Sequence, residues 1–236
     1  MKHILFTLVL ALSPSVMSAQ CPDNNHPHMI DLGLPSGLKW ACRDVGTNIP
    51  FIGWYAWGET EEKEEYRKEN YKWLSDYSYT KYTLDDKKEV LELKDDVAHV
   101  KWGNGWRMPT LDEMKELIGN TTASFDTSNK GFFLKSKING AWIFLPARGE
   151  FRKEDRNGIT KGYYNSFYWT STIHFGSKAA YFIRLDGAVN SNRAQIMLGE
   201  TAEFREYGLY EITNSILQWV EVVLDDVEDG FCINLK

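Results

Sequence analysis

Side chains that could do chemistry occur in small groups along this chain of 236 residues. Asp95 and Asp96 stand just before His99, and carboxylates are dense from Glu59 to Glu65. Calcium needs several oxygen ligands and the spacing of an EF-hand is missing, so we interpret one of the two aspartates as a helix cap. A single histidine is weak evidence for a general base, and His99 is interpreted as structural. The carboxylate-rich segment is interpreted as a solvated surface.

Histidines and cysteines raise the question of a metal. His26 and His28 lie in a polar, turn-rich stretch, and no Cys, Asp or Glu stands nearby at a complementary spacing, so we expect a solvated tail. Cys21, Cys42 and Cys232 form no CxxC pair, which disfavours a zinc site. The sequence therefore predicts no metal site and no cofactor.

Motifs of enzymes are missing from the sequence. It contains no Gly-x-Ser-x-Gly elbow, no His-Glu-x-x-His pair and no phosphate-binding glycine loop. Carboxylate pairs such as Glu150 and Asp155 are expected by chance among 33 acidic residues. Trp54 and Trp57 could form a sugar-stacking platform, but large rings more often anchor loops in the interior. We expect a protein that is not an enzyme.

The first 19 residues have the pattern of a secretory signal: Lys2, then an apolar run over 4–12, then small residues. This run is far shorter than the roughly 20 residues that span a bilayer, and no later stretch is long enough, so we expect no transmembrane segment. Residues 20–28 are interpreted as an N-terminal linker. The net charge of -6 argues against nucleic acid as a partner.

The cysteine count bears on export and on disulfides. Cys21 follows the signal, but a lipoprotein signal has a small residue before the cysteine, and Gln20 is not small, so plain secretion is favoured. An odd count in an oxidising compartment leaves at least one thiol free or intermolecular. Cys42 could pair with Cys232, which would join the two ends of the domain, or with Cys21.

A helix over 111–118 is the best-specified element. Thr110 and Glu113 form a capping box, four apolar residues fall at helical spacing, and Gly119-Asn120 ends the run. Before it, two tryptophans surround a Gly-Asn-Gly turn. A shorter helix is expected around 95–100.

Hairpins account for most other expected elements. Turns at 34–37, 139–140 and 186–187 separate runs with strand composition. The segment 66–94 is expected to be a long irregular connection packed by its aromatic residues. Two short helices and a set of antiparallel hairpins predict an α+β fold.

Six blocks in order resemble the Fibrobacter succinogenes major paralogous domain family, which is abundant in secreted and surface proteins of Bacteroidota. The blocks are 31–42 (DLGLPSGLKWAC), 56–60 (AWGET), 95–100 (DDVAHV), 102–110 (WGNGWRMPT), 143–147 (IFLPA) and 168–171 (YWTS). The resemblance covers about 31–185 and implies a C-type-lectin-like fold without an established enzymatic activity. It makes 29–236 one domain.

The C-terminus departs from the family pattern, which closes with a glycine and a short strand. Residues 208–212 and 230–234 are both imperfect candidates for this strand. The second is favoured, which implies an insertion near 197–229. The first would make everything from residue 213 onward an additional tail.

The resemblance also implies where a ligand would bind, because a long loop region carries the variable ligands of such folds. Here that region maps to Arg148, Arg152, Asp155, Arg156, Asn157, Tyr163, Tyr164 and Asn165. Tyrosines can stack on sugars, and arginine and asparagine can donate directed hydrogen bonds. The Glu-Pro-Asn-type triplet of calcium-dependent sugar binding is missing, which disfavours that mode.

The sequence thus predicts an exported, non-catalytic module that binds a glycan or a surface or host protein. The alternatives are a structural or adhesive component of a cell-surface assembly and, with less support, an enzyme related to formylglycine-generating enzymes. Those enzymes depend on cysteines near the end of the chain, and Cys232 has no cysteine close to it in sequence.

Overall fold

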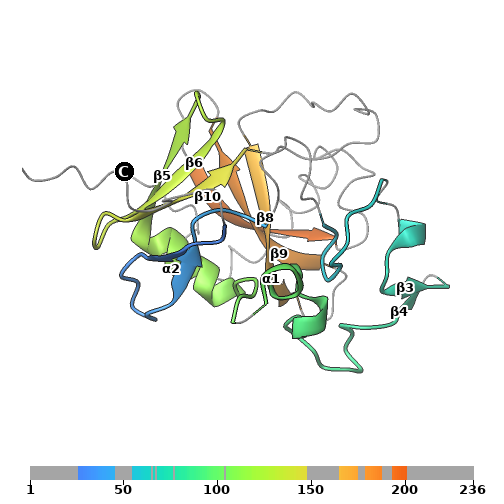
Figure 1. Ribbon diagram of the computed structural model, residues 1–236. Helices are drawn as coiled ribbons and strands as arrows, with labels where there is room; N and C mark the ends of the chain where they lie inside the picture. Colours follow the sequence, from blue (N-terminus) through green and yellow to red (C-terminus); the bar gives the residue numbers. More distant parts are fainter. Residues whose placement is uncertain are drawn as a thin grey trace, which may run out of the picture.

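The computed structural model describes residues 26–45, 55–64, 66, 68–76, 78–103, 105–147, 165–174, 179–187 and 193–200. These residues form a mixed α+β structure in which every sheet is antiparallel (Figure 1). Two three-stranded sheets, β5-β6-β7 and β10-β9-β8, make up most of it, and two short hairpins accompany them. The coarse α+β prediction is therefore confirmed.

The chain opens with the predicted hairpin. Strand β1 (Met29–Asp31) pairs with β2 (Lys39–Ala41), and the Gly37 amide donates to the Leu34 carbonyl across the turn. Gly37 has φ +72°, a conformation that favours glycine. The hairpin is fixed to the helix that follows later, because the Ser36 amide and hydroxyl both donate to the Glu116 carboxylate, at 2.8 and 2.5 Å.

Both predicted helices form where the capping residues place them. Helix α1 (Val97–Trp102) begins after Asp96, whose carboxylate accepts from the His99 amide at 3.0 Å. Its end carries the predicted tight loop, with the Trp102 and Trp106 rings edge-to-face at 5.5 Å. The imidazole Nδ1 of His99 lies 3.1 Å from the Trp106 carbonyl, which confirms its structural role.

Helix α2 (Leu111–Asn120) has the full capping box. The Thr110 hydroxyl accepts from the Glu113 amide at 3.4 Å, and the Glu113 carboxylate accepts from the Thr110 amide at 2.8 Å. The Glu113 carboxylate also pairs with Arg107, and this hydrogen bond lowers its pKa. The charge that caps the helix is thereby kept ionised.

Substituting Thr110 by alanine is expected to lower the free energy of unfolding by about 1 kcal/mol, because an amide at the start of α2 loses its acceptor. Urea unfolding followed by circular dichroism measures this change. Thr80→Ala, at an exposed position outside the helices, is the control and should change stability by less than about 0.5 kcal/mol. Equal effects of the two substitutions would contradict the importance of the cap.

The first three-stranded sheet follows α2 directly. Strand β5 (Thr121–Asp126) pairs with β6 (Gly131–Ser136), which pairs with β7 (Trp142–Pro146). The β6-β7 hairpin is the one predicted from Asn139-Gly140, and Gly140 has φ +76°. Strand β5 was not predicted, because its residues combine threonine, serine and alanine without a strong apolar alternation.

The second sheet consists of β8 (Asn165–Ile173), β9 (Ala179–Asp186) and β10 (Arg193–Glu200). Its β8-β9 register shifts: Trp169 pairs with Phe182 and Ile173 with Ala180, so 170–172 lie opposite a single residue of β9. Strand β10 extends into the region predicted to begin an insertion at 197. The rest of that region, both candidate closing strands and the signal segment lie outside the described residues.

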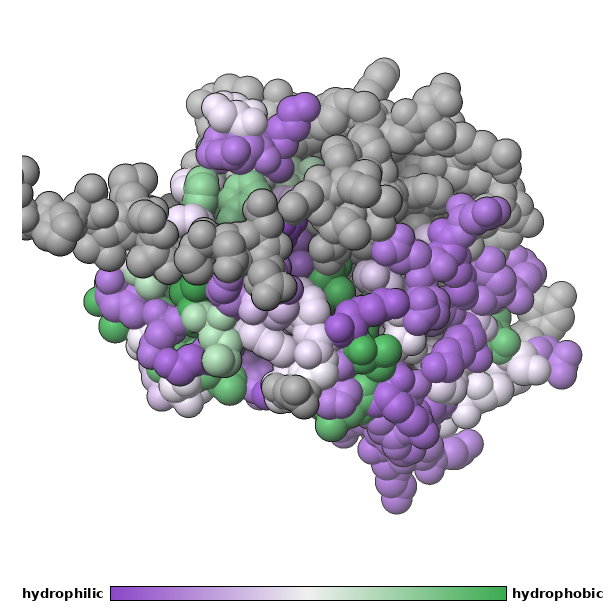
Figure 2. All heavy atoms as spheres, viewed as in Figure 1, coloured by the Kyte–Doolittle hydropathy of each residue, from purple (hydrophilic) through white to green (hydrophobic). Residues whose placement is uncertain are grey.

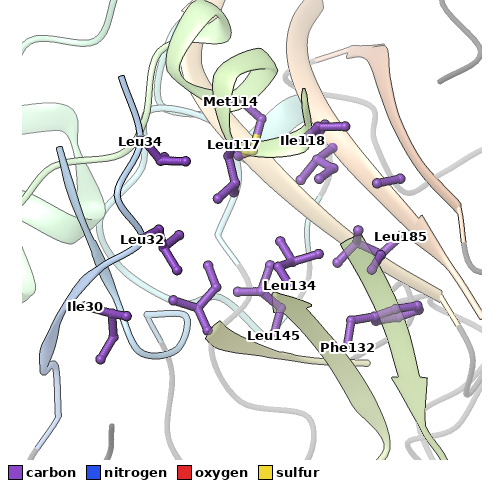
Figure 3. Packing of buried hydrophobic residues seen from close by; sticks show 14 of the residues in the cluster. Ile30, Leu32, Leu34, Met114, Leu117, Ile118, Phe132, Leu134, Leu145 and Leu185 are labelled. Atoms are coloured by element: carbon purple, nitrogen blue, oxygen red, sulfur yellow. The ribbon is translucent and has the colours of Figure 1, made fainter. Parts of the chain in front are cut away.

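One hydrophobic cluster joins the opening hairpin, α2 and both three-stranded sheets. Figure 3 shows the apolar side chains of the opening hairpin and of α2 converging on those of the sheets. The labelled residues come from the first hairpin (Ile30, Leu32, Leu34), from α2 (Met114, Leu117, Ile118) and from strands (Phe132, Leu134, Leu145, Leu185). The periodicity that predicted α2 thus marks its buried face.

A second, smaller cluster holds the irregular segment between the first hairpin and α1. Its buried members are Trp57, Tyr82, Leu91, Ile173 and Ala180. This segment contains the 3₁₀ turns η2 (Lys68–Asn70) and η3 (Leu93–Asp95) and the two-residue strands β3 (Leu74–Ser75) and β4 (Ser78–Tyr79). The prediction of a connection packed by its aromatic residues is confirmed.

Candidate functional site

The predicted ligand-binding residues belong to the connection between β7 and β8. Residues 148–164, which include seven of the eight candidates, lie outside the described residues, and Asn165 is described only as the first residue of β8. The structure does, however, describe the two ends of this connection. They belong to different sheets, because β7 pairs with β6 and β8 pairs with β9.

Hydrogen bonds hold the two ends of the connection together. The Pro146 carbonyl, at the end of β7, accepts from the Ser166 hydroxyl at 2.8 Å and from the Tyr168 hydroxyl at 2.6 Å. The next residue, Ala147, donates its amide to the Lys130 carbonyl at 2.8 Å. The described residues on either side of this connection therefore lie next to each other.

Buried carboxylates are the other conspicuous chemical groups. Asp95 is 1% exposed and pairs with Lys72 at 3.0 Å, with Lys81, and with the Tyr82 hydroxyl at 2.8 Å. Burial acts to raise the pKa of Asp95, but the hydrogen bonds from these partners outweigh it and lower the pKa below its ordinary value. Asp95 is thus a fixed negative charge, which suits an ion-pair anchor and not a proton donor.

The partners of Asp95 form a network with Glu92. Lys81 pairs with both Glu92 and Asp95, and although burial acts to lower its pKa, the hydrogen bonds to the two carboxylates raise it. The pKa of Glu92 falls to about 2, because it accepts hydrogen bonds from Lys81, Lys88 and Lys94. Burial raises the pKa of Tyr82 to about 12. Every charge in this network has a partner of opposite sign.

The surface around this network is strongly polar. Figure 2 shows hydrophilic residues concentrated on the side of the molecule where Figure 1 places β3 and β4. Lys72 and Lys81 also lie over the Trp73 ring, with their ammonium groups 4.3 and 4.8 Å from its centroid. This ring therefore already has two cationic partners.

Asp96 and Glu59 are the other buried acids among the described residues. Asp96 caps α1 and accepts from the Met108 amide at 2.8 Å, and burial raises its pKa. Glu59 is 4% exposed and accepts from Lys63 at 2.6 Å and from the Lys72 amide at 2.7 Å. The prediction that 59–65 is a solvated surface is therefore wrong for Glu59, because its carboxylate organises the neighbouring turn.

Trp57 is a buried anchor and not part of an exposed platform. It is 1% exposed, its indole Nε1 donates to the Thr170 carbonyl at 2.8 Å, and its ring meets Tyr82 edge-to-face at 4.9 Å. This confirms the more frequent of the two uses considered for Trp57. Trp54 lies outside the described residues.

A third group combines two histidines with a cysteine. Nδ1 of His26 lies 3.1 Å and Nδ1 of His28 3.7 Å from Sγ of Cys42, and the imidazole rings meet edge-to-face at 5.2 Å. Cys42 is a free, buried thiol, whereas both histidines are half-buried. Cys232 and Cys21 lie outside the described residues, so the two predicted disulfide pairings stay predictions.

The prediction that His26 and His28 belong to a solvated tail is therefore wrong, because it compared only positions along the chain. His28 and Cys42 are 14 positions apart, yet the β1-β2 register makes them neighbours: Met29 pairs with Ala41, and the Cys42 amide donates to the His28 carbonyl at 3.0 Å. The predicted hairpin already indicated that residues near 28 and near 42 lie close together. Counting back from its turn at 34–37 would have placed residue 28 opposite residue 43, one position away from Cys42.

Within the residues described, neither helix is long or apolar enough to cross a membrane, in agreement with the sequence. Comparisons of the chain with protein-family models, with curated proteins and with solved structures give no match.

Proposed function

We propose that this chain is an exported, non-catalytic binding module with a C-type-lectin-like fold, and that residues 148–165 bind a glycan or a surface protein. The order of elements, two helices followed by antiparallel hairpins, is compatible with such a fold. The six sequence blocks that resemble the Fibrobacter succinogenes major paralogous domain family support the same proposal. Export follows from the signal-like pattern of the first 19 residues.

The proposal rests on the hydrogen bonds that join the end of β7 to the start of β8. A single carbonyl, that of Pro146, accepts from both Ser166 and Tyr168, so the described residues that flank 148–164 lie side by side. Binding residues are commonly placed on loops that a rigid scaffold positions. The connection is also longer than the few residues that usually join neighbouring strands, and long connections in folded domains are usually functional or serve as linkers.

The chemistry of the described interior supports binding over catalysis. The carboxylates of Glu59, Asp95 and Asp96 are tied to lysines or to backbone amides that shape the irregular segment and α1. A general acid or base must exchange a proton with its substrate at working pH. The low pKa of Asp95 instead suits an ion-pair anchor, and the contacts of Asp96 suit a helix cap.

Binding of the exported protein to a broad glycan array, with calcium and then with chelator, tests the proposal. We expect specific binding that persists in chelator and that falls about 100-fold in Tyr163→Ala/Tyr164→Ala. Each stacking contact is worth roughly a factor of ten, because about 1.4 kcal/mol corresponds to tenfold in Kd. Tyr66→Ala, which removes a tyrosine outside this connection, is the matched control and should bind like the original protein.

Other outcomes of this experiment count against the proposal in distinct ways. Binding that chelator abolishes would contradict the expected metal-independent mode. Binding that Tyr163→Ala/Tyr164→Ala leaves unchanged would move the site away from residues 148–165. A blank array would reject the glycan and favour a protein partner or an assembly role, which an intact-mass measurement for lipid or disulfide adducts at Cys21 would then examine.

A further inference from the structure

Two imidazoles and a thiol lie close together beside the β1-β2 hairpin. The ligand atoms of His26, His28 and Cys42 all lie within 4.8 Å of one another. Cys42 belongs to the main hydrophobic cluster and is 1% exposed, while the two histidines are half-buried beside it. From this arrangement we propose that the three side chains bind one Zn²⁺ ion per chain.

The distances match what a tetrahedral zinc ion requires. Bonds of about 2.3 Å to sulfur and about 2.0–2.1 Å to nitrogen, at a tetrahedral angle, separate the two ligand atoms by about 3.6 Å. The corresponding separations are 3.1 Å between Cys42 Sγ and His26 Nδ1, and 3.7 Å between Cys42 Sγ and His28 Nδ1. The two sulfur–nitrogen separations thus fit one ion, and the ligand nitrogens, which lie within 4.8 Å of each other, would have to lie about 3.3 Å apart to share it.

The backbone holds these donors in place. Cys42 continues the β1-β2 pairing by one residue, because its amide donates to the His28 carbonyl at 3.0 Å. The Cys42 carbonyl accepts from the Phe144 amide of β7 at 2.9 Å, which fixes the thiol relative to the first three-stranded sheet. The imidazole of His26 lies beside that of His28, with the ring centroids 5.2 Å apart.

The donor types select the class of ion. Magnesium and calcium prefer oxygen ligands, whereas two imidazoles and a thiolate suit zinc. Zn²⁺ is also redox-inert, so it can bind a thiolate without oxidising it. Binding releases the thiol proton to water and leaves the oxidation state of sulfur unchanged. The bound ion would fasten residues 26–28 to the core through Cys42.

Cobalt provides the spectroscopic test, because Co²⁺ replaces Zn²⁺ in tetrahedral sites and absorbs in the near ultraviolet when a thiolate is bound. The full chain, exported from a bacterial host and stripped with chelator, is titrated with Co²⁺ and then with Zn²⁺. We expect one ion per chain, a thiolate band that Cys42→Ser abolishes, and displacement of cobalt by zinc but not by Mg²⁺ or Ca²⁺.

Histidine variants keep the test valid if Cys42→Ser fails to fold. His26→Gln and His28→Gln change half-buried side chains, and each should weaken zinc binding by more than about 100-fold, since even partners outside the first shell typically contribute 10- to 100-fold. The matched control, His174→Gln, should leave affinity unchanged. A cobalt spectrum without a thiolate band, or an affinity that His28→Gln does not alter, would overturn the proposal.

A disulfide bond at Cys42 would use the same sulfur atom and would therefore prevent zinc binding. Peptide mass spectrometry of the unreduced exported protein distinguishes the two, and Cys42 linked to Cys21 or Cys232 would reject the zinc site. Neither result affects the proposed glycan binding, which is measured in the presence of chelator and depends on other residues.

Discussion

Replacement of Trp57 by alanine is expected to lower the free energy of unfolding by about 3–5 kcal/mol, the cost typical of removing a large buried aromatic side chain. The indole is a buried member of the second hydrophobic cluster and contacts Tyr82 edge-to-face. Its loss also leaves the Thr170 carbonyl without the donor that it has at 2.8 Å. Both effects detach the irregular segment from the β8-β9 pair.

Urea unfolding followed by far-ultraviolet circular dichroism measures this change. Trp102→Ala is the matched control, because Trp102 is half-buried and has one edge-to-face partner, Trp106, at 5.5 Å. We expect it to cost about 1 kcal/mol. If Trp57→Ala costs no more than Trp102→Ala, the second cluster does not stabilise the fold as described.

Asp95→Asn is expected to cost about 3 kcal/mol at neutral pH. Breaking a buried ion pair leaves the opposite charge poorly compensated, and Lys81, whose side chain is only 12% exposed, loses one of its two carboxylates. The value lies at the low end for buried pairs, because Glu92 remains 2.6 Å from Lys81. The Tyr82 hydroxyl also loses the charge of its acceptor.

The same substitution has a defined pH dependence. The pKa of Asp95 lies below its ordinary value of 3.8, so the folded state binds fewer protons than the unfolded state around and below this pH. The stabilisation is therefore present above about pH 4 and is lost as the pH falls through the folded pKa. Asp96, whose pKa is raised, is the same in both proteins and cancels from the difference.

Urea unfolding of both proteins between pH 7 and pH 3 measures the difference in stability. We expect this difference to be constant near neutrality and to shrink in acid. Lys94→Gln is the control, since Lys94 is 73% exposed and its pair with Glu92 should contribute less than about 1 kcal/mol. A difference that grows as the pH falls would contradict the direction of the pKa shift.

Local chemistry explains which elements the sequence could predict. The capping box of Thr110 and Glu113, the Asn139-Gly140 turn and the hairpin around residue 36 depend on neighbouring residues, and all three form as expected. Strand β5 escaped prediction because its stability comes from pairing with β6, and not from its own composition.

Contacts between distant segments explain what the sequence could not predict. Glu59 resembles its exposed acidic neighbours, and the fold places the Lys72 amide, 13 residues later, within 2.7 Å of its carboxylate. His26, His28 and Cys42 meet because of a strand register, which spacing along the chain does not display. The candidate residues of 148–165 came from a family resemblance. The described structure adds the hydrogen bonds of Pro146 with Ser166 and Tyr168, which join the ends of β7 and β8.

The register shift in β8 leaves backbone groups of this strand available for contacts outside the sheet. Residues 170–172 face one residue of β9, and their groups bind elsewhere: Thr170 with Trp57, Ser171 with Leu91 and Pro109. A regular ladder would use these backbone groups within the sheet. The irregular segment uses them through Trp57 and Leu91, so it is attached to β8 without replacing β9 as the partner of that strand. The bulge thus lets one strand pair with its neighbour in the sheet and also bind a segment outside the sheet.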